Sequence, residues 1–275
     1  MVKDKITKRF ASSNALYICD MSKPLILVTN DDSIYSKGIK SLIEAVLPLG
    51  DVVVVAPDSP QSGMGHAVTI HGILRVNEEK IFPGVKAYST SGTPVDCVKL
   101  AIGSVLDRKP DLLVSGINHG SNSSINVIYS GTMSAAVEGA VEGIPSVGFS
   151  LLDHDHDADF RASQKVVRTI AENILNDGKL PEGICLNVNI PKGAPEEIKG
   201  IRICRQAKAY WEDNFDHRKD PMGKPYYWML GEFKNFDKGE DTDEFALKNN
   251  FVSVVPVQYD LTAYHAISHL QQWNL

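Results

Sequence analysis

A short apolar run that ends in adjacent acids constrains this chain more than any other feature. Leu25–Val28 leads through one threonine into Asn30, Asp31 and Asp32. Four consecutive apolar residues predict a strand that is buried on both faces, which is typical of a parallel sheet. Ligands of open parallel sheets bind beyond the carboxyl ends of the strands. The acids are therefore predicted to lie at a ligand site.

Two adjacent carboxylates repel each other, so something must relieve that repulsion. A divalent cation held by oxygen ligands would do so, and so would a proton shared between the two groups. A purely structural alternative is that Asp32 or Ser33 caps a helix beginning near Ser36 or Lys37, with Asp31 solvated. The residues of this stretch alone leave these interpretations open.

From this strand to residue 190, apolar strand-like runs alternate with segments of helical spacing. Further strands are predicted at 51–56, 68–76, 85–88, 111–118, 144–151 and 184–190, and helices at 39–47, 98–105 and 162–175. Thr93 and Pro94 suit the N-cap and first position of the second helix. This alternation predicts an α/β fold, a Rossmann-like, doubly wound, mostly parallel sheet, with 68–76 and 85–88 as an antiparallel excursion.

The C-terminal part has a different composition. Residues 205–232 are rich in aromatic and charged side chains, and 221–225 predict the turn of a protruding β-hairpin. A closing strand at 251–257 and a terminal helix at 266–273 follow. The aromatic side chains Tyr210, Trp211, Tyr226, Tyr227 and Trp228 exceed what a small appendage can bury, which favours a subunit interface over a base-stacking platform.

These patterns divide the chain into three regions. They are an N-terminal extension at 1–22, a Rossmann-like core at 23–190, and a C-terminal region at 191–275 with the hairpin, closing strand and terminal helix. A transit peptide is an alternative for the first region, which Asp4 and Asp20 disfavour.

Composition excludes several classes of partner. The formal charge of −6 without a basic cluster disfavours polymeric nucleic acid. Four widely spaced cysteines predict neither a zinc knuckle nor a disulfide framework, and fit reduced thiols in a cytoplasmic protein. The chain has no apolar run long enough to predict a membrane span.

Polar segments follow other predicted strands at the same edge of the sheet. The loop after 51–56 carries Ser62 and His66 among glycines, and residues 116–131 are rich in Asn, Ser and Gly. Ser130–Thr132 begins a predicted helix and offers hydroxyl and backbone N–H groups to a phosphate, although simple capping also explains it. Hard oxygen ligands of these kinds suit Mg²⁺ or Mn²⁺.

Two other interpretations are disfavoured. A nicotinamide enzyme would need a glycine-rich turn after the first strand, where this chain has acids. The run Asp153–Asp157 looks like a metal cluster, but such a run after a strand is more often a solvated loop.

Several spaced motifs together resemble the SurE (survival protein E) phosphatases. They are Asn30–Asp32 with Ser36–Gly38, Ala56–Asp58 with Ser62 and Gly65–His66, Ser91–Cys97, Ser115–Asn118 with Gly120 and Asn122, and Tyr129–Thr132 with Glu138–Gly139. The resemblance extends from about Leu25 to the C-terminus, and a joint match of spaced motifs is far more specific than any one of them.

The resemblance implies a metal-dependent 5'-nucleotidase, a hydrolase of nucleoside monophosphates at the 5' or 3' phosphate and sometimes of short polyphosphate. It implies one divalent ion per subunit, Mg²⁺ or Mn²⁺, and a homodimer or homotetramer joined through the C-terminal hairpin. The implied metal ligands are Asp31, Asp32, Ser62 and Asn118. The implied phosphate contacts are Asn118, Asn122, Ser130, Gly131 and Thr132.

Elementary chemistry gives a consistent mechanism. A cation at the two acids would lower the pKa of a bound water, which would then attack phosphorus directly. Asp31 and Asp32 are therefore the predicted catalytic residues, with Asp32 favoured to orient or deprotonate the water. A serine intermediate at Ser130 stays open.

The chain departs from the family pattern at two places, and two rival classes stay in view. Ser33 stands where the family usually has glycine, so a positive φ there would strain the backbone. The loop that begins at His119 also differs, which could alter base or ribose preference. A non-catalytic nucleotide or metal sensor would keep the same acids. Phosphatases of the Asp-x-Asp kind need acids separated by one residue, whereas Asp31 and Asp32 are adjacent.

Overall fold

A nine-stranded sheet forms the centre of the computed structural model, which describes residues 23–176 and 180–274. The strand order is β3 (Val76–Glu79), β4 (Lys86–Thr90), β2 (Asp51–Pro57), β1 (Leu25–Thr29), β5 (Leu112–His119), β6 (Ser146–Leu151), β7 (Ile184–Ile190), β11 (Val252–Gln258) and β8 (Ile201–Ile203). The six strands from β4 to β7 are parallel, whereas β3 and β11 run antiparallel to β4 and β7. The predicted extension at 1–22 lies outside the described residues.

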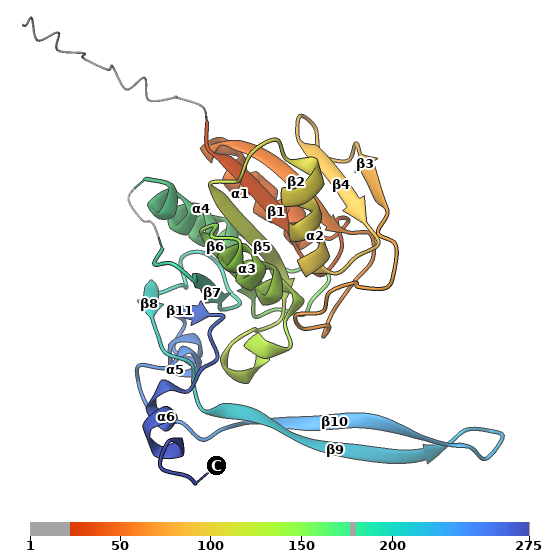
Figure 1. The fold of residues 1–275 in the computed structure, drawn as a ribbon, viewed down its shortest axis with the longest axis vertical. Helices are drawn as coiled ribbons and strands as arrows, with labels where there is room; N and C mark the ends of the chain where they lie inside the picture. The colour runs from red at the N-terminus through yellow and green to blue at the C-terminus, as the bar shows by residue number, and fades with distance from the viewer. Residues whose placement is uncertain (1–22, 177–179, 275) are drawn as a thin grey trace, which may run out of the picture.

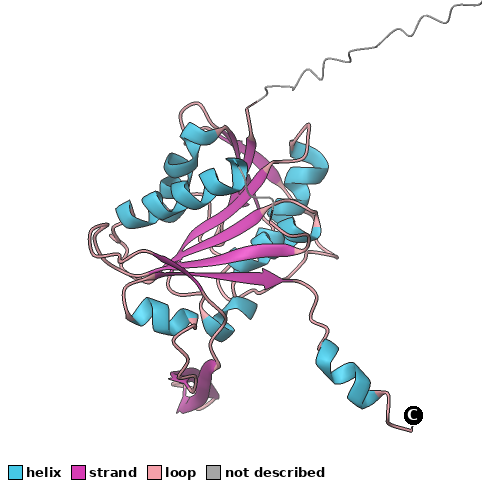
Figure 2. Ribbon diagram, turned by 90° about the vertical axis from the view of Figure 1, so that its left-hand side faces the viewer, coloured by secondary structure: helices cyan, strands magenta, loops and turns pink. Residues whose placement is uncertain are grey.

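Helices cover both faces of this sheet (Figure 2). On one face lie α1 (Lys37–Val46) and α4 (Arg161–Asn176), and on the other lie α2 (Pro94–Leu100) and α3 (Gly131–Val141). Short helical turns, η1 (Leu47–Leu49), η2 (Ala101–Val105) and η3 (Ser124–Ile128), extend or precede these helices. The doubly wound, mostly parallel α/β fold predicted from the alternation is confirmed.

The alternation of side chains along β1 explains why both faces need helices. Ile26 and Val28 pack with α1 and α4, while Leu27 packs with α2 and α3, and all three side chains are fully buried. Because successive residues of a strand point to opposite faces, a continuous apolar run requires an apolar layer on each side. The sheet is therefore the middle layer of three.

The C-terminal region adds a long arm and a separate helix (Figure 1). The antiparallel strands β9 (Ala209–Lys219) and β10 (Pro225–Asn235) form the predicted hairpin, and they project away from the sheet. Next come α5 (Asp243–Lys248), the closing strand β11, and α6 (Tyr264–Leu270), none of whose residues is buried. In the described part of the chain, no helix is long and apolar enough to cross a membrane.

Three local predictions have instructive outcomes. Thr93 caps α2 with Pro94 in the first turn, as predicted, and Asp96 completes a capping box. The strand predicted at 68–76 is wrong for 68–75, because β4 pairs instead with the residues from Val76 onward. At α1 the cap is Ser36, whose hydroxyl accepts from the amide of Ile39 at 3.3 Å, so neither Asp32 nor Ser33 has that role.

Ser33 adopts the left-handed backbone conformation that glycine favours, with φ of 82°. Its carbonyl accepts a hydrogen bond from Asn30 Nδ2 at 2.7 Å, and its hydroxyl accepts one from the amide of Tyr35 at 3.3 Å. A side chain in this region costs about 1–2 kcal/mol. The turn between the acids and α1 is therefore strained at Ser33, where the family pattern usually has glycine.

We expect Ser33→Gly to stabilise the protein by roughly 1 kcal/mol, since relief of the left-handed strain exceeds the entropy that glycine adds to the unfolded chain. Urea unfolding at one fixed protein concentration measures the change. Ser41→Gly in the middle of α1 is the matched control, and it should destabilise by about 0.5 kcal/mol. A lower midpoint for Ser33→Gly would contradict the assigned strain.

Candidate active site at the carboxyl edge of the sheet

The two acids lie at the carboxyl end of β1, between β2 and β5 in the centre of the parallel strands. Asp31 is only 3% exposed, and Asp32 is partly buried. Backbone amides from both neighbouring connections reach this pair: Gln61 N–H donates to Asp31 O at 2.7 Å, and His119 N–H donates to Asp32 Oδ2 at 3.4 Å. The acids are therefore held at the edge where a doubly wound fold binds its ligands.

The first turn of α3 packs directly against Asp31. The hydroxyl of Thr132 donates to Asp31 Oδ1 at 2.5 Å. A Cβ on Gly131 would lie 2.7 Å from Cβ of Asp31, so only glycine allows this approach. Ser130 caps the helix, with its hydroxyl accepting from the amide of Met133 at 3.1 Å. The Ser-Gly-Thr motif is thus both a helix cap and one wall of the acid pair.

Asn118 reaches the same edge from β5 at an irregularity of the strand. The pairing of β5 with β6 shifts between Ser115 and Asn118, and such bulges commonly redirect a side chain next to a site. The Asn118 amide nitrogen donates to the carbonyls of His119 at 3.2 Å and Gly120 at 2.9 Å. These bonds leave the side-chain oxygen as the group that a ligand can use.

Ser62 lies in the loop at 58–75 and is exposed. The residue before it donates to the Asp31 carbonyl, and Gly65 N–H donates to the Tyr129 carbonyl at 3.1 Å. The loop is thereby fastened to the acid strand and to the start of α3. Asp31, Asp32, Asn118, Ser62 and the Ser130–Thr132 turn all belong to one edge of the sheet.

Asn122 lies farther along this edge and is 6% exposed. Its amide nitrogen donates to Ser150 Oγ at 2.8 Å, and its backbone N–H donates to Asn189 Oδ1 at 2.8 Å. Asn187 completes the arrangement by donating to the Asn122 carbonyl at 2.8 Å. The side-chain nitrogen of Asn122 is occupied here, and a phosphate contact at this residue stays a prediction.

The two asparagines of β7 were not among the site residues predicted from the sequence. Asn187 and Asn189 are buried, and the Asn189 amide donates to the Asn187 side-chain oxygen at 2.9 Å. Their spacing of two residues in an otherwise apolar strand was the available signal, because it places both amides on one face. Their hydrogen bonds to the backbone of Asn122 hold the loop at 119–123.

Burial and mutual repulsion dominate the electrostatics of the acids. Burial, followed by the neighbouring negative charge of Asp32, raises the pKa of Asp31 to about 6, although the Thr132 hydrogen bonds oppose this shift. Burial also raises the pKa of Asp32, against the lowering effect of the His119 amide. Two carboxylates in this state would gain from a cation placed between them.

The residues present fit a hard divalent cation. Within residues 23–176 and 180–274, no group of three His, Cys, Asp or Glu side chains could hold a metal ion, so a cation at this edge would need neutral oxygens beside the acids. The Asn118 oxygen and the Ser62 hydroxyl are such groups. Two carboxylates with neutral oxygens suit Mg²⁺ or Mn²⁺ and not structural zinc. The Asp153–Asp157 segment is largely exposed, in keeping with the solvated loop that the sequence favoured.

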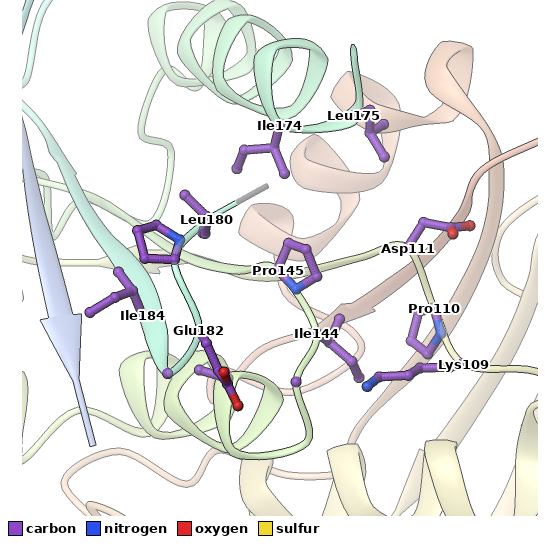
Figure 3. Close-up of a pocket in the computed structure, with 14 residues that line it drawn as sticks. Lys109, Pro110, Asp111, Ile144, Pro145, Ile174, Leu175, Leu180, Glu182 and Ile184 are labelled. Atoms are coloured by element: carbon purple, nitrogen blue, oxygen red, sulfur yellow. The ribbon is translucent and has the colours of Figure 1, made fainter. Parts of the chain in front are cut away.

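A cavity of about 650 Å³ lies at the amino ends of the parallel strands, on the side of the sheet away from the acids (Figure 3). Its lining includes Asp111, Pro145 and Ile184, which lie at the amino ends of β5, β6 and β7. Because ligands of parallel sheets bind at the carboxyl ends, this cavity is separate from the candidate active site.

Comparison with known proteins identifies the family of this chain. A family model described as Survival protein SurE matches residues 26–213. The chain is 62% identical to the 5'-nucleotidase SurE of Flavobacterium psychrophilum, over 93% of this chain and 99% of that protein. It is 61% identical to the 5'-nucleotidase SurE of Christiangramia forsetii, over 92% of this chain and 98% of that protein.

A solved structure shows the same fold. The SurE protein from Aquifex aeolicus is 42% identical, with a TM-score of 0.79, and the match covers 90% of this chain and 98% of that one. The family that the spaced motifs predicted is therefore confirmed, and the chain belongs to the SurE family.

Proposed function

We propose that the chain is a 5'-nucleotidase that hydrolyses nucleoside 5'-monophosphates to nucleoside and phosphate with one Mg²⁺ or Mn²⁺ ion per subunit. The observation that carries this proposal is the acid pair at the end of β1, packed against the first turn of α3. The names of the relatives support the same activity. Nucleoside 3'-monophosphates and short polyphosphate are further candidate substrates, because each presents a terminal phosphoryl group to the site.

In this proposal the residues at the carboxyl ends of the strands share metal binding, proton transfer and phosphate binding. Asp31, Asp32, Ser62 and Asn118 would hold the cation, which would supply a water of lowered pKa as the nucleophile. Asp32, the more exposed acid, would orient the attacking water and accept its proton. The backbone N–H groups at Gly131 and Thr132 and the dipole of α3 stabilise the negative charge of the phosphate. Asn122 contacts the phosphate or orders the loop that does.

We further propose that the core at 23–190 carries the chemistry, while the region at 191–275 assembles a homodimer or homotetramer through the hairpin. Both strands of the arm expose large apolar side chains, among them Phe215 at 50%, Trp228 at 58% and Met229 at 70%. A two-stranded hairpin with no layer beneath it is at best marginally stable, so a second subunit would bury these side chains. The buried free thiols Cys97, Cys185 and Cys204 support a cytoplasmic location.

Asp31→Asn should lower the rate of phosphate release from a nucleoside monophosphate by about 100-fold or more, since a neutral amide neither binds nor polarises the cation as well. Phosphate release with Mn²⁺, before and after addition of EDTA, measures the effect. Asp51→Asn, at the amino end of β2, is the matched control and should retain activity. Hydrolysis by the unsubstituted protein that survives EDTA would contradict the proposal. If the unsubstituted protein binds Mn²⁺ without any hydrolysis, that result would favour a non-catalytic sensor.

The same variant offers a check on folding. Burial disfavours the charged Asp31 carboxylate, so the metal-free Asp31→Asn protein should unfold at a urea concentration no lower than the unsubstituted protein. Its inactivity would then reflect the lost ligand and not a lost fold. A lower midpoint would show that Asp31 stabilises the structure without metal.

Tyr227→Glu together with Trp228→Glu should reduce the molecular mass in solution to that of a smaller assembly, because charges placed on the arm cannot be buried without partners. Size-exclusion chromatography with light scattering measures the mass. Leu47→Glu is the control, because it changes an exposed apolar residue outside the arm. An unchanged mass for the double variant would exclude the hairpin as the principal interface.

A further inference from the structure

Glu138 is an acid in the interior of the protein that the proposed chemistry does not use. It lies in the last part of α3 and is 3% exposed. Its Oε2 contacts His66 Nε2 at 2.8 Å, and its Oε1 accepts a hydrogen bond from Lys99 of α2. The hydrogen bond from His66, followed by the pairing with Lys99, lowers its pKa, so the group is an ionised carboxylate.

A buried carboxylate that is paired with a lysine and hydrogen-bonded to a histidine needs a reason beyond stability. Replacing such a cluster by apolar side chains of similar volume is often neutral or stabilising, because the charges must be desolvated. The neighbouring residues of α3 are mostly small and apolar, as in Ala135, Ala136 and Ala140. The cluster joins α3 to α2 and to the loop at 58–75. These connections indicate that it positions the loop relative to α3.

The His66 contact fastens the part of the loop that carries Ser62. Gln61 N–H bonds to the Asp31 carbonyl before Ser62, and Gly65 N–H bonds to the Tyr129 carbonyl after it. His66 adds the side-chain anchor that immediately follows. Loops of this length without regular structure are uncommon and are often functional, and their residues need such anchors to hold one position.

A second group of bonds holds the rest of the loop independently. Thr69 donates to Asp96 through its amide at 3.0 Å and its hydroxyl at 2.6 Å, and the Thr93 hydroxyl donates to the Ala67 carbonyl at 2.7 Å. Loss of the His66 contact would therefore leave the loop attached at 67–69. Its effect should be confined to the stretch that contains Ser62.

We propose that His66 and Glu138 are positioning residues that hold Ser62 at the acid pair, so that one helix places ligands from two separate segments. The first turn of α3 contacts Asp31 through Gly131 and Thr132, and the same helix carries Glu138 farther along. A helix is stiff over this length, so both contacts move together. Lys99 pairs with the other carboxylate oxygen of Glu138. In this proposal, Lys99 has no part in holding the loop. The inference rests on the proposed metal site.

Mn²⁺ affinity of the full-length metal-free protein, measured by calorimetry without substrate, tests the inference. His66→Ala should weaken binding about 10-fold or more, as is typical when a residue that supports a metal ligand is removed. His66→Gln keeps a donor for Glu138 and should restore most of the affinity. His71→Ala, an exposed histidine in the same loop, is the matched control and should bind Mn²⁺ like the unsubstituted protein.

A double-mutant cycle links the effect to Ser62. If His66 acts through Ser62, then Ser62→Ala weakens Mn²⁺ binding and adding His66→Ala to it has little further effect. Hydrogen exchange of the amides at 61–66 in the metal-free protein should also accelerate in His66→Ala, while those at 67–69 keep their protection. At saturating Mn²⁺, His66→Ala should recover most of kcat.

Specific results would overturn the inference. Unchanged affinity in His66→Ala, or full additivity with Ser62→Ala, would show that His66 does not position Ser62. A loss of kcat with unaltered Mn²⁺ affinity would instead make His66 a substrate contact. Additivity in a protein that hydrolyses nucleotides rejects this inference alone. Coupled Mn²⁺ binding in a protein without hydrolysis rejects the nucleotidase alone, and no Mn²⁺ binding at all rejects both.

Discussion

Repulsion between two neighbouring carboxylates at the end of the central strand is the constraint on which the site depends. The strand buries its apolar side chains on both faces, and its end carries Asp31 into an interior position where charge is unfavourable. The structure tolerates this only because Thr132, the amide of His119 and the first turn of α3 lie against the acids. In the proposed function, a cation bound between the two acids would relieve this repulsion, so the unfavourable burial of charge would favour metal binding.

Helix α3 connects this constraint to the surrounding loops. Its start has a glycine where the Asp31 side chain packs, and its far part has an acid that reaches the loop carrying Ser62. On the other side, Asn187 and Asn189 of β7 hold the loop that follows β5. Regular elements therefore fix loops that have little structure of their own, which is how α/β enzymes commonly build precise sites from flexible segments.

The C-terminal arm differs from the core in the exposure of its apolar side chains. The core buries its apolar side chains within the chain, whereas β9 and β10 expose aromatic side chains along their length. The base of the arm is nevertheless tied to the site region, because the Ser124 hydroxyl bonds to the carbonyls of Ala207 and Ala209, and the Trp211 indole donates to Asn126 at 2.8 Å. The base of the arm and the loop after β5 thus share hydrogen bonds.

The sequence by itself determined the alternation of strands and helices, the cap at Thr93, the hairpin, the family, and the acids at the end of the first strand, because these follow from local spacing or from short motifs. Tertiary structure alone decided that Ser36 and not Ser33 caps α1, that 68–75 stays outside the sheet, and that Asn187, Asn189 and Glu138 support the site. His66 and Glu138 are 72 residues apart. No local pattern encodes such a contact, because it exists only once the order of strands in the sheet has brought α3 beside the loop after β2.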